Sequence, residues 1–251
     1  FYREDWVQTG IEGLDSLLEK GIPRGTSVIV AGGPGSGKTI LCLQAINNAV
    51  KKGENAIYIS LEEHPFRLEK HMHDFGWNPE NFIKKGLLKI IRVDPFAIAR
   101  DVEALLAKAK GELMIDFEEV ASIMPQGFKP KWVILDSISA LESAFKDDED
   151  TYRLYIQQLF RYFERLGVTS LLVSETENIP KKYSRTGVEE FLADGVMVLY
   201  HLKKGNIRER AIEILKMRGS AHQSKIVAMQ IISEVGIEVY PEQEIFGGIE
   251  E

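Results

Sequence analysis

The sequence predicts an α/β fold, with a mostly parallel central sheet flanked by helices and an antiparallel extension at the C-terminal end. Between residues 28 and 175, short apolar runs alternate with amphipathic stretches of helical length, as in parallel strands joined by crossover helices. After residue 175, strand-like segments follow one another with short turns, as in antiparallel hairpins. We see no internal repeat and no low-complexity linker, so we expect a single domain over residues 1–251.

The parallel part is expected to contain five strands. Each is a short run rich in apolar residues, and the five lie at 28–31, 55–61, 88–93, 131–136 and 168–174. The helices between them are expected directly after the first strand, over 65–75 with Pro65 in the first turn, from about residue 97, and over 151–166. The last helix places aromatic side chains at helical spacing, which indicates a buried face. The acidic run 147–150 before it suits a helix N-terminus better than a metal site.

The C-terminal part is expected to extend the sheet at one edge. Its four strand-like segments are 193–202, 208–217, 226–233 and 237–240, and we expect them to pair as antiparallel neighbours. Residues 111–130 fit neither pattern and are expected to form an inserted loop.

Composition limits the classes of protein that the chain can belong to. Its apolar content of 44% is enough for a sizeable core and argues against extended disorder. A formal net charge of −7 is unlike that of a dedicated duplex-DNA binder, which carries a basic face. The single cysteine, Cys42, fits a reducing compartment, and no apolar run approaches the roughly 18 residues of a membrane span. We therefore expect a cytoplasmic protein without a membrane partner.

The most informative motif is the segment 32–39, which reads Gly-Gly-Pro-Gly-Ser-Gly-Lys-Thr between an apolar strand and an apolar helical pattern. In this context it predicts a phosphate-binding loop, because glycines let successive N–H groups face an anion and the helix adds its positive end. Lys38 is expected to reach the β- and γ-phosphates of a nucleoside triphosphate, and the Thr39 hydroxyl to ligate Mg²⁺. The expected contacts are Gly33, Pro34, Gly35, Ser36, Gly37, Lys38, Thr39 and Ile40.

Hydrolysis needs further groups, and three acids are candidates. Asp136 ends an apolar strand, where a carboxylate lies beside the phosphate loop and can hold Mg²⁺. Glu62 and Glu63 follow the second strand at the same sheet edge, where a carboxylate can orient and deprotonate the attacking water. Neighbouring residues of a strand point to opposite faces, so we expect only one of these two to do the chemistry.

Two further pairs of polar residues are candidates for a functional role. Lys216 and Arg218 are two apart at a strand end and project from one face. Such pairs often serve solubility, and the functional interpretation is an arginine finger that neutralises charge on a γ-phosphate, without indicating whose phosphate. His71 and His73 are two apart on a predicted helix, roughly 200° around its axis, so we do not expect them to share a metal.

Together these motifs resemble the RecA/RadA superfamily and, within it, the KaiC-like ATPases. The resemblance spans nearly the whole chain and is most specific in its first and last two segments. The matching segments are 9–15, 32–39, 61–63, 135–137, 187–191 with Asp194, and 215–220. The resemblance implies a RecA-like P-loop NTPase fold and a ring, usually a hexamer, with the nucleotide between subunits.

On this resemblance, ATP or ADP with Mg²⁺ is held by residues of two subunits, and Glu62 is the water-activating acid with Glu63 beside it. The first subunit supplies Lys38, Thr39 and Asp136 together with Glu62 and Glu63. The neighbouring subunit supplies Lys216 and Arg218 to the γ-phosphate, with Ser220 and His222 near the nucleotide.

The chain departs from the clock proteins of this family in two ways. Those members carry two such domains in tandem, and this chain has one. The Ser–Thr phosphoacceptor pair of the clock kinase's second domain falls near Glu190 and Phe191, so we expect no autokinase activity on that pair.

The leading interpretation is a Mg²⁺-dependent ATPase ring whose hydrolysis drives a conformational or signalling change. One alternative is a RecA-like motor that binds nucleic acid through residues 178–185, where Lys181, Lys182 and Arg185 would face the central channel. Another is a slow ATP-sensing module that binds a protein partner. The choice of ATP over GTP rests on the resemblance, since no base-reading motif is present.

Overall fold

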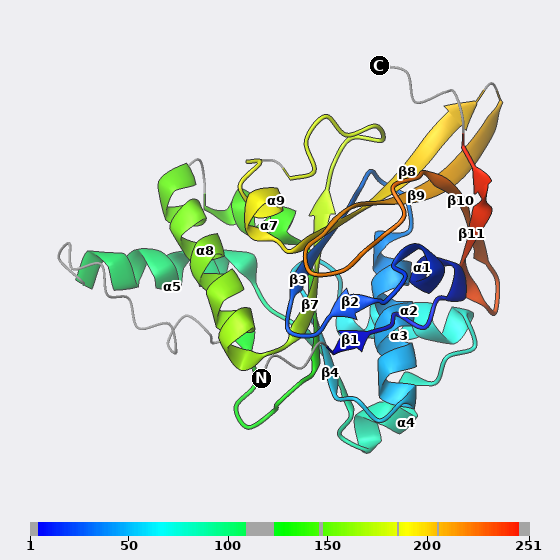
Figure 1. The fold of residues 1–251 in the computed structure, drawn as a ribbon. Coiled ribbons are helices and arrows are strands. Elements are labelled where there is room, and N and C mark those ends of the chain that lie inside the picture. The colour runs from blue at the N-terminus through cyan, green and yellow to red at the C-terminus, as the bar shows by residue number, and fades with distance from the viewer. Residues whose placement is uncertain (1–4, 109–122, 146–147, 185, 205, 246–251) are drawn as a thin grey trace.

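The structure is a computed structural model that describes residues 5–108, 123–145, 148–184, 186–204 and 206–245. Within them, a central sheet of nine strands runs through the molecule with helices on both faces (Figure 1). The strands lie in the order β11-β10-β9-β8-β3-β7-β6-β4-β5. Their bounds are β3 (Ser27–Gly32), β4 (Ala56–Ser60), β5 (Leu88–Arg92), β6 (Trp132–Asp136), β7 (Thr169–Glu175), β8 (Gly195–Lys204), β9 (Ile207–Met217), β10 (Val227–Ile232) and β11 (Gly236–Glu244).

The sheet is parallel from β8 to β5 and antiparallel beyond β8. β3 pairs in parallel with β7 and with β8, and β7, β6, β4 and β5 continue the parallel part. β9 is antiparallel to β8, β10 to β9, and β11 to β10. The predicted fold class and the antiparallel pairing of the four C-terminal segments are therefore confirmed. The sequence did not indicate that the first of these segments, β8, also follows a crossover containing α9 (Glu189–Leu192) and pairs in parallel with β3.

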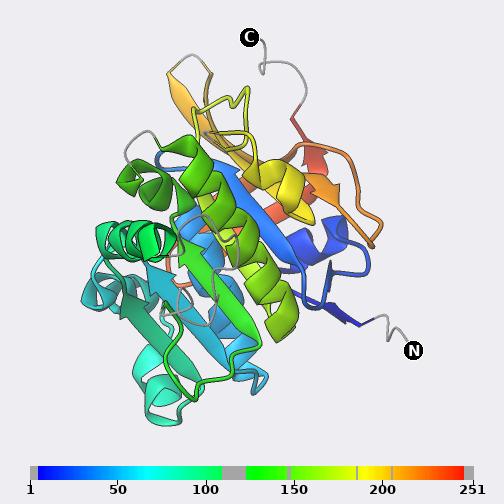
Figure 2. The ribbon, with the colours of Figure 1, turned by 90° about the vertical axis from the view of Figure 1, so that its left-hand side faces the viewer.

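Helices cover both faces of the sheet, which explains the continuous apolar runs of its strands. Every residue of β3, β4 and β6 is buried. One apolar core lies under α1, α2 and α3, and a second lies under α5, α7 and α8 (Figures 1 and 2). The helix bounds are α1 (Glu12–Leu17), α2 (Lys38–Lys51), α3 (Pro65–Asp74), α4 (Pro79–Lys84), α5 (Pro95–Lys108), α7 (Ile138–Ala144) and α8 (Glu149–Leu166).

The predicted helix signals are found at α3 and α8. Pro65 is in the first turn of α3, where its missing N–H costs no hydrogen bond. The Asp148 side chain accepts a hydrogen bond from the Thr151 N–H at the start of α8, and Gly167 ends that helix with a φ of 66°. Asp147 and residues 111–122 of the predicted inserted loop lie outside the described residues. Within the described ranges, no helix combines the length and apolar character needed to cross a membrane.

The opening motif, residues 9–15, has a structural role that periodicity alone did not predict. The Asp15 carboxylate accepts hydrogen bonds from the Thr9 N–H and hydroxyl and from the Gly10 N–H, at 2.8 to 2.9 Å. These bonds fold the chain back into α1, which packs against β11. A Cβ at Gly13 would lie 1.9 Å from the Val239 carbonyl oxygen, so only glycine permits this approach. α1 and the two-residue strands β1 (Trp6–Val7) and β2 (Ile22–Pro23) are too short to show a hydrophobic periodicity in the sequence.

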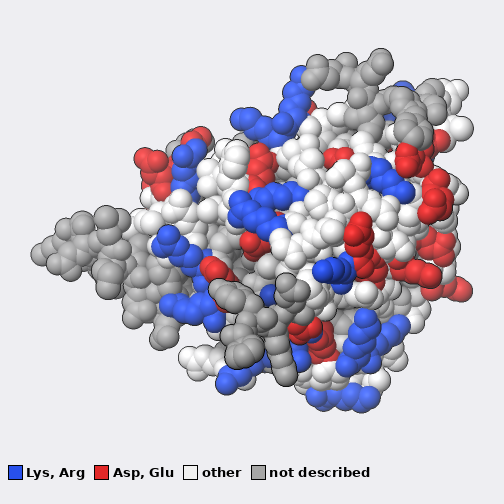
Figure 3. Space-filling view, viewed as in Figure 1, with Lys and Arg blue, Asp and Glu red and all other residues white. Residues whose placement is uncertain are grey.

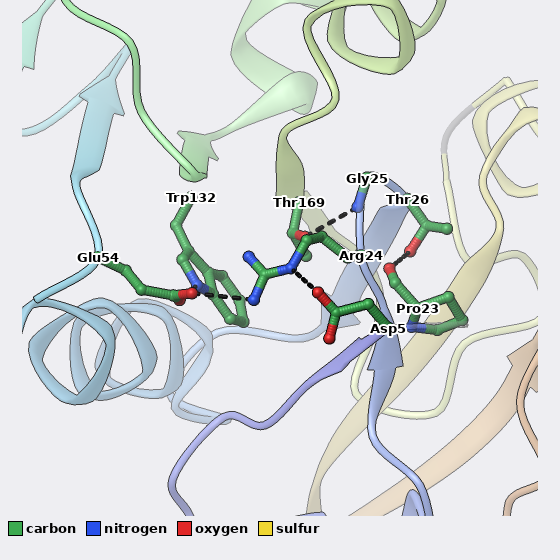
Figure 4. A network of polar contacts seen from close by, with 8 residues as sticks. All are labelled: Asp5, Pro23, Arg24, Gly25, Thr26, Glu54, Trp132 and Thr169. Carbon is green, nitrogen blue, oxygen red and sulfur yellow. Dashed lines mark hydrogen bonds and ion pairs between the residues drawn. The ribbon is translucent and has the colours of Figure 1, made fainter. Parts of the chain in front are cut away.

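A polar network joins the amino ends of several strands, at the edge opposite the phosphate loop (Figure 4). The Glu54 carboxylate accepts from the Trp132 indole N–H at 2.7 Å and from the Arg24 guanidinium at 2.9 Å. Arg24 also pairs with Asp5 at 2.8 Å, and the Asp5 side chain is 55% exposed. Trp132 is fully buried, so its N–H depends on Glu54 for a partner.

Replacing Glu54 is therefore expected to destabilise the fold more than replacing Asp5. Glu54→Ala leaves a buried indole N–H unpaired and should lower the free energy of unfolding by about 1–3 kcal/mol. Asp5→Ala removes an exposed ion pair and should cost less than about 1 kcal/mol. Urea unfolding of both variants measures the difference, and Glu54→Gln, which keeps an acceptor oxygen, should fall between them. Equal losses for Glu54→Ala and Asp5→Ala would contradict this account.

Candidate functional site

The phosphate loop, residues 33–37, joins the carboxyl end of β3 to the start of α2. Gly35 and Gly37 have φ angles of 72° and 105°, a left-handed backbone that glycine adopts without strain. At Gly33, a Cβ would lie 2.5 Å from the Asn178 amide oxygen. α2 begins without a side-chain cap, so its first N–H groups can face an anion. The loop therefore has the geometry of a phosphate cradle.

Lys38 is a buried cation at the base of this cradle. Its ammonium group donates to the Gly33 carbonyl oxygen at 3.1 Å, and the residue is only 8% exposed. Burial lowers the pKa of Lys38, and the negative charges of Glu175 and Asp136 oppose that shift. An anionic ligand at the loop would add the charge partner that the buried ammonium needs.

Asp136 and Thr39 meet as the sequence predicted. The Thr39 hydroxyl donates to Asp136 Oδ2 at 3.1 Å, and the Tyr58 hydroxyl donates to the same oxygen. Burial raises the pKa of Asp136, and these two hydrogen bonds oppose the shift. The strand register explains the arrangement, because Ser60 of β4 and Asp136 of β6 are paired at the carboxyl edge of the sheet.

Strand geometry predicted that Glu62 and Glu63 would point to opposite faces, and this prediction is wrong. β4 ends at Ser60, so the two residues lie in a bend after the strand, and both line the same cavity. The Ser137 hydroxyl donates to Glu62 Oε1 at 3.4 Å, and Glu63 Oε2 lies 3.5 Å from Nε2 of His71. Partial burial, and then the charges of Glu175 and Asp136, raise the pKa of Glu62. The two glutamates therefore share a cavity but differ in their partners.

The phosphate-loop cavity has a volume of about 390 Å³, and its walls include three residues that sequence reasoning missed. Glu175 ends β7 beside Gly32, so the rule that carboxyl ends of parallel strands meet could have found it. Arg210 reaches the loop from β9 and donates from Nε to the Gly35 carbonyl oxygen at 3.0 Å. His71 comes from α3. The sequence did not indicate that Arg210 and His71 line the cavity, because tertiary packing alone brings them there.

The oxygen atoms of Thr39 and Asp136 suit a Mg²⁺ ion, which prefers hard oxygen ligands and binds with few protein groups and several waters or phosphates. Within the described residues, no cluster of three or more His, Cys, Asp or Glu side chains has the arrangement of a metal site. A Mg²⁺ ion bound to these two oxygens would complete its shell with waters or phosphate oxygens. The residues present fit that mode of binding.

Lys216 and Arg218 lie outside the phosphate-loop cavity of their own chain. Lys216 Nζ donates to the carbonyl oxygens of Glu190 and Ala193 at 3.0 and 2.6 Å, and Arg218 Nη2 donates to that of Phe191 at 3.2 Å. Both side chains thus reach α9 from one side of β9, as their spacing predicted. Burial, and then the charge of Arg218, lower the pKa of Lys216.

Ser220 and His222 also lie away from the phosphate-loop cavity. The Ser220 hydroxyl donates to the Ala221 carbonyl oxygen at 3.4 Å, and both residues are partly exposed. Neither is among the residues that line the cavity. The candidate residues therefore form two groups, one at the phosphate loop and one around α9 and the segment after β9.

Comparison with known proteins places this geometry in a family. A sequence model of the KaiC ATPases matches residues 7–244. A UPF0273 protein of Thermotoga maritima is 35% identical over 240 residues, which cover 94% of this chain and 96% of that protein. The circadian clock protein KaiC3 of Synechocystis is 31% identical over 242 residues, and the match spans 45% of its length. A solved structure of a KaiC-like protein from Pyrococcus horikoshii has a TM-score of 0.75, with 32% identity, and the match covers 94% of this chain and 99% of that one.

A parallel sheet with this strand order, a phosphate loop after β3 and an antiparallel extension define an α/β protein of the RecA-like class. The chain belongs to the KaiC family of ATPases.

The buried carboxylate of Asp136 should make stability depend on pH. Because its pKa is raised in the folded state, the folded protein binds this proton more tightly than the unfolded chain does, and stability falls as the pH rises through that raised pKa. Asp136→Asn removes the buried charge and keeps an acceptor for Tyr58 and Thr39. In nucleotide-free and Mg²⁺-free protein, we expect the variant to be more stable than wild type at pH 8.

Urea midpoints measured from pH 8 down to about pH 4 test this expectation, because the advantage of Asp136→Asn should shrink as wild-type Asp136 takes up its proton. Asp148→Asn is the matched control, and its effect on stability at pH 8 should be the opposite, a loss. Hydrogen bonds from Thr151 lower the pKa of Asp148, so its charge is favourable in the folded state. An Asp136→Asn variant that loses stability at pH 8 would contradict the assignment of a buried, charged carboxylate.

Proposed function

We propose that this protein is a Mg²⁺-dependent ATPase that binds ATP in the phosphate-loop cavity and forms a homo-oligomeric ring, a hexamer by its resemblance to the KaiC-like ATPases. Strands β3 to β11 share one sheet, which supports a single domain. One observation carries the proposal. The phosphate-loop cavity contains the groups that we propose bind phosphate and activate water. Lys216 and Arg218 of the same chain, at the end of β9, lie outside it and donate to carbonyl oxygens of α9.

The charges of the cavity support the requirement for a divalent cation. Its walls carry the carboxylates of Glu62, Glu63, Asp136 and Glu175 but only the permanent cations of Lys38 and Arg210. A triphosphate added to this excess of negative charge would be repelled. Mg²⁺ would neutralise phosphate charge and polarise the γ-phosphate.

Each group of the cavity has a proposed task. Lys38, now bonded to the Gly33 carbonyl oxygen, would turn to the β- and γ-phosphates. Arg210 uses one donor on the loop and keeps others for a phosphate oxygen. Glu62 would take the proton of the attacking water, and its raised pKa makes its carboxylate the better base. Arg218 of a neighbouring subunit would neutralise the charge that develops on the γ-phosphate.

The nucleic-acid alternative has weaker support. Lys181 and Lys182 are exposed, but Glu175 and Glu177 line the same hollow and reduce its positive potential. Arg185 lies outside the described residues. On the face seen in Figure 3, basic and acidic side chains are interspersed.

The buried thiol of Cys42 suits a reducing compartment, which supports a cytoplasmic location.

Replacement of Lys38 should abolish nucleotide binding. Lys38→Ala removes the charged donors to two phosphates, so the dissociation constant for ATP with Mg²⁺ should rise by at least about a hundredfold. Lys52→Ala, at the other end of α2, is the matched control and should bind as wild type does. Calorimetric titration measures both. A Lys38→Ala protein that is folded and retains wild-type affinity would refute this placement of the nucleotide.

The shared site can be tested by mixing two inactive variants. Arg218→Ala should reduce turnover by about 10³-fold while changing ATP affinity little, and Glu62→Gln should also stop turnover. In a ring assembled from equal amounts of both, about a quarter of the interfaces would pair an intact Glu62 with an intact Arg218. We therefore expect about a quarter of wild-type activity. No recovery in rings shown by mass spectrometry to be mixed would count against action between subunits.

A further inference from the structure

The two neighbouring glutamates of the phosphate-loop cavity are held by different partners. Glu62 accepts from the Ser137 hydroxyl, whereas Glu63 Oε2 lies 3.5 Å from the His71 ring nitrogen Nε2. His71 comes from the third turn of α3, and its side chain is 45% exposed while that of Glu63 is 37% exposed. Both residues line the cavity. An ionisable imidazole therefore faces one of the two candidate bases at the mouth of the site.

A histidine side chain can gain a proton near neutral pH, and His71 is the histidine among the described residues that line this cavity. The cavity brings it together with Lys38 from α2, Glu62 and Glu63 from the bend after β4, Asp136 from β6, Glu175 from β7 and Arg210 from β9. On its own helix, Arg67 and Asp74 lie one turn before and after it. Glu80 of α4, which also packs near α3, is hydrogen-bonded to His73 at 2.5 Å.

The charge on His71 decides how Glu63 acts on a bound triphosphate. When the imidazole is protonated, it pairs with Glu63 and offsets one of the four carboxylate charges in the cavity. When it is neutral, the Glu63 charge is free to repel the phosphates. The exposure of both side chains keeps the effect moderate, in the range of exposed ion pairs.

We propose that His71 is a positioning residue that holds Glu63 at the mouth of the cavity, leaves Glu62 as the base, and makes nucleotide affinity depend on pH. Affinity rises as His71 gains its proton and falls as it loses it. This inference rests on the proposed binding of a nucleotide in the cavity. It assigns a task of its own to Glu63, the neighbour of the proposed base.

The test measures the dissociation constant of the Mg²⁺ complex of a β,γ-imido ATP analogue from about pH 5.5 to 8.5. The ionisation of the analogue is common to all variants, so each profile is read relative to that of His71→Gln. Wild type should bind about fivefold more tightly than His71→Gln at the acidic end and equally at the basic end. His71→Lys, a permanent cation, should retain the tight binding throughout. Glu63→Gln should bind tightly with a profile parallel to that of His71→Gln.

His73→Gln is the matched control. His73 lies two residues further along α3, is similarly exposed and also pairs with a glutamate, but it does not line the cavity. Its variant should follow the wild-type profile. Circular dichroism at each pH confirms that the variants are folded, and Glu63→Gln breaks the pair from the other side if His71→Gln does not fold.

The outcomes separate this inference from the function on which it rests. Parallel profiles for wild type and His71→Gln, or for wild type and Glu63→Gln, would overturn the role of His71 and leave nucleotide binding intact. Failure of wild type to bind the analogue at any pH would overturn the proposed function itself, and this inference with it.

Discussion

The burial of the Lys38 ammonium at the carboxyl edge of the parallel sheet is the constraint on which the site depends. A buried cation needs compensating charge, and here the backbone carbonyl of Gly33 and nearby carboxylates supply it. The same carboxylates are costly to bury, as the raised pKa of Asp136 indicates. The free protein thus keeps like charges close together in a small cavity. A polyanion that arrives with a divalent cation would relieve both problems, which is why we propose that ligand.

Much of the fold followed from the sequence because its signals are local. Continuous apolar runs predicted the buried strands, and Pro65 and Asp148 marked where helices begin. The meeting of Thr39 with Asp136 followed from a topological rule about the ends of parallel strands. The same rule could have found Glu175, but Arg210 and His71 reach the cavity only through tertiary packing. Arg210 reaches the phosphate loop from the antiparallel strand β9, and no local sequence pattern predicts this contact. The direction of β8 also depends on a crossover that its own residues do not encode.

The candidate residues form two separate groups, and this separation is the basis for proposing that two subunits share each site. Arg218 is exposed and bonded to a carbonyl of α9, so it is available to another molecule and already oriented by the chain that carries it. A subunit built in this way would bind nucleotide alone but complete its chemistry only with a neighbour. Hydrolysis would then be coupled to assembly, and the state of one site would be transmitted to the next through β9 and α9.

The most direct test of this account is the ATPase activity per subunit as a function of protein concentration, with the particle mass measured at each concentration. The account predicts that activity per subunit falls steeply when dilution converts rings into monomers, even with saturating ATP and Mg²⁺, while nucleotide binding persists. Activity per subunit that stays constant in solutions shown to contain only monomers would contradict it.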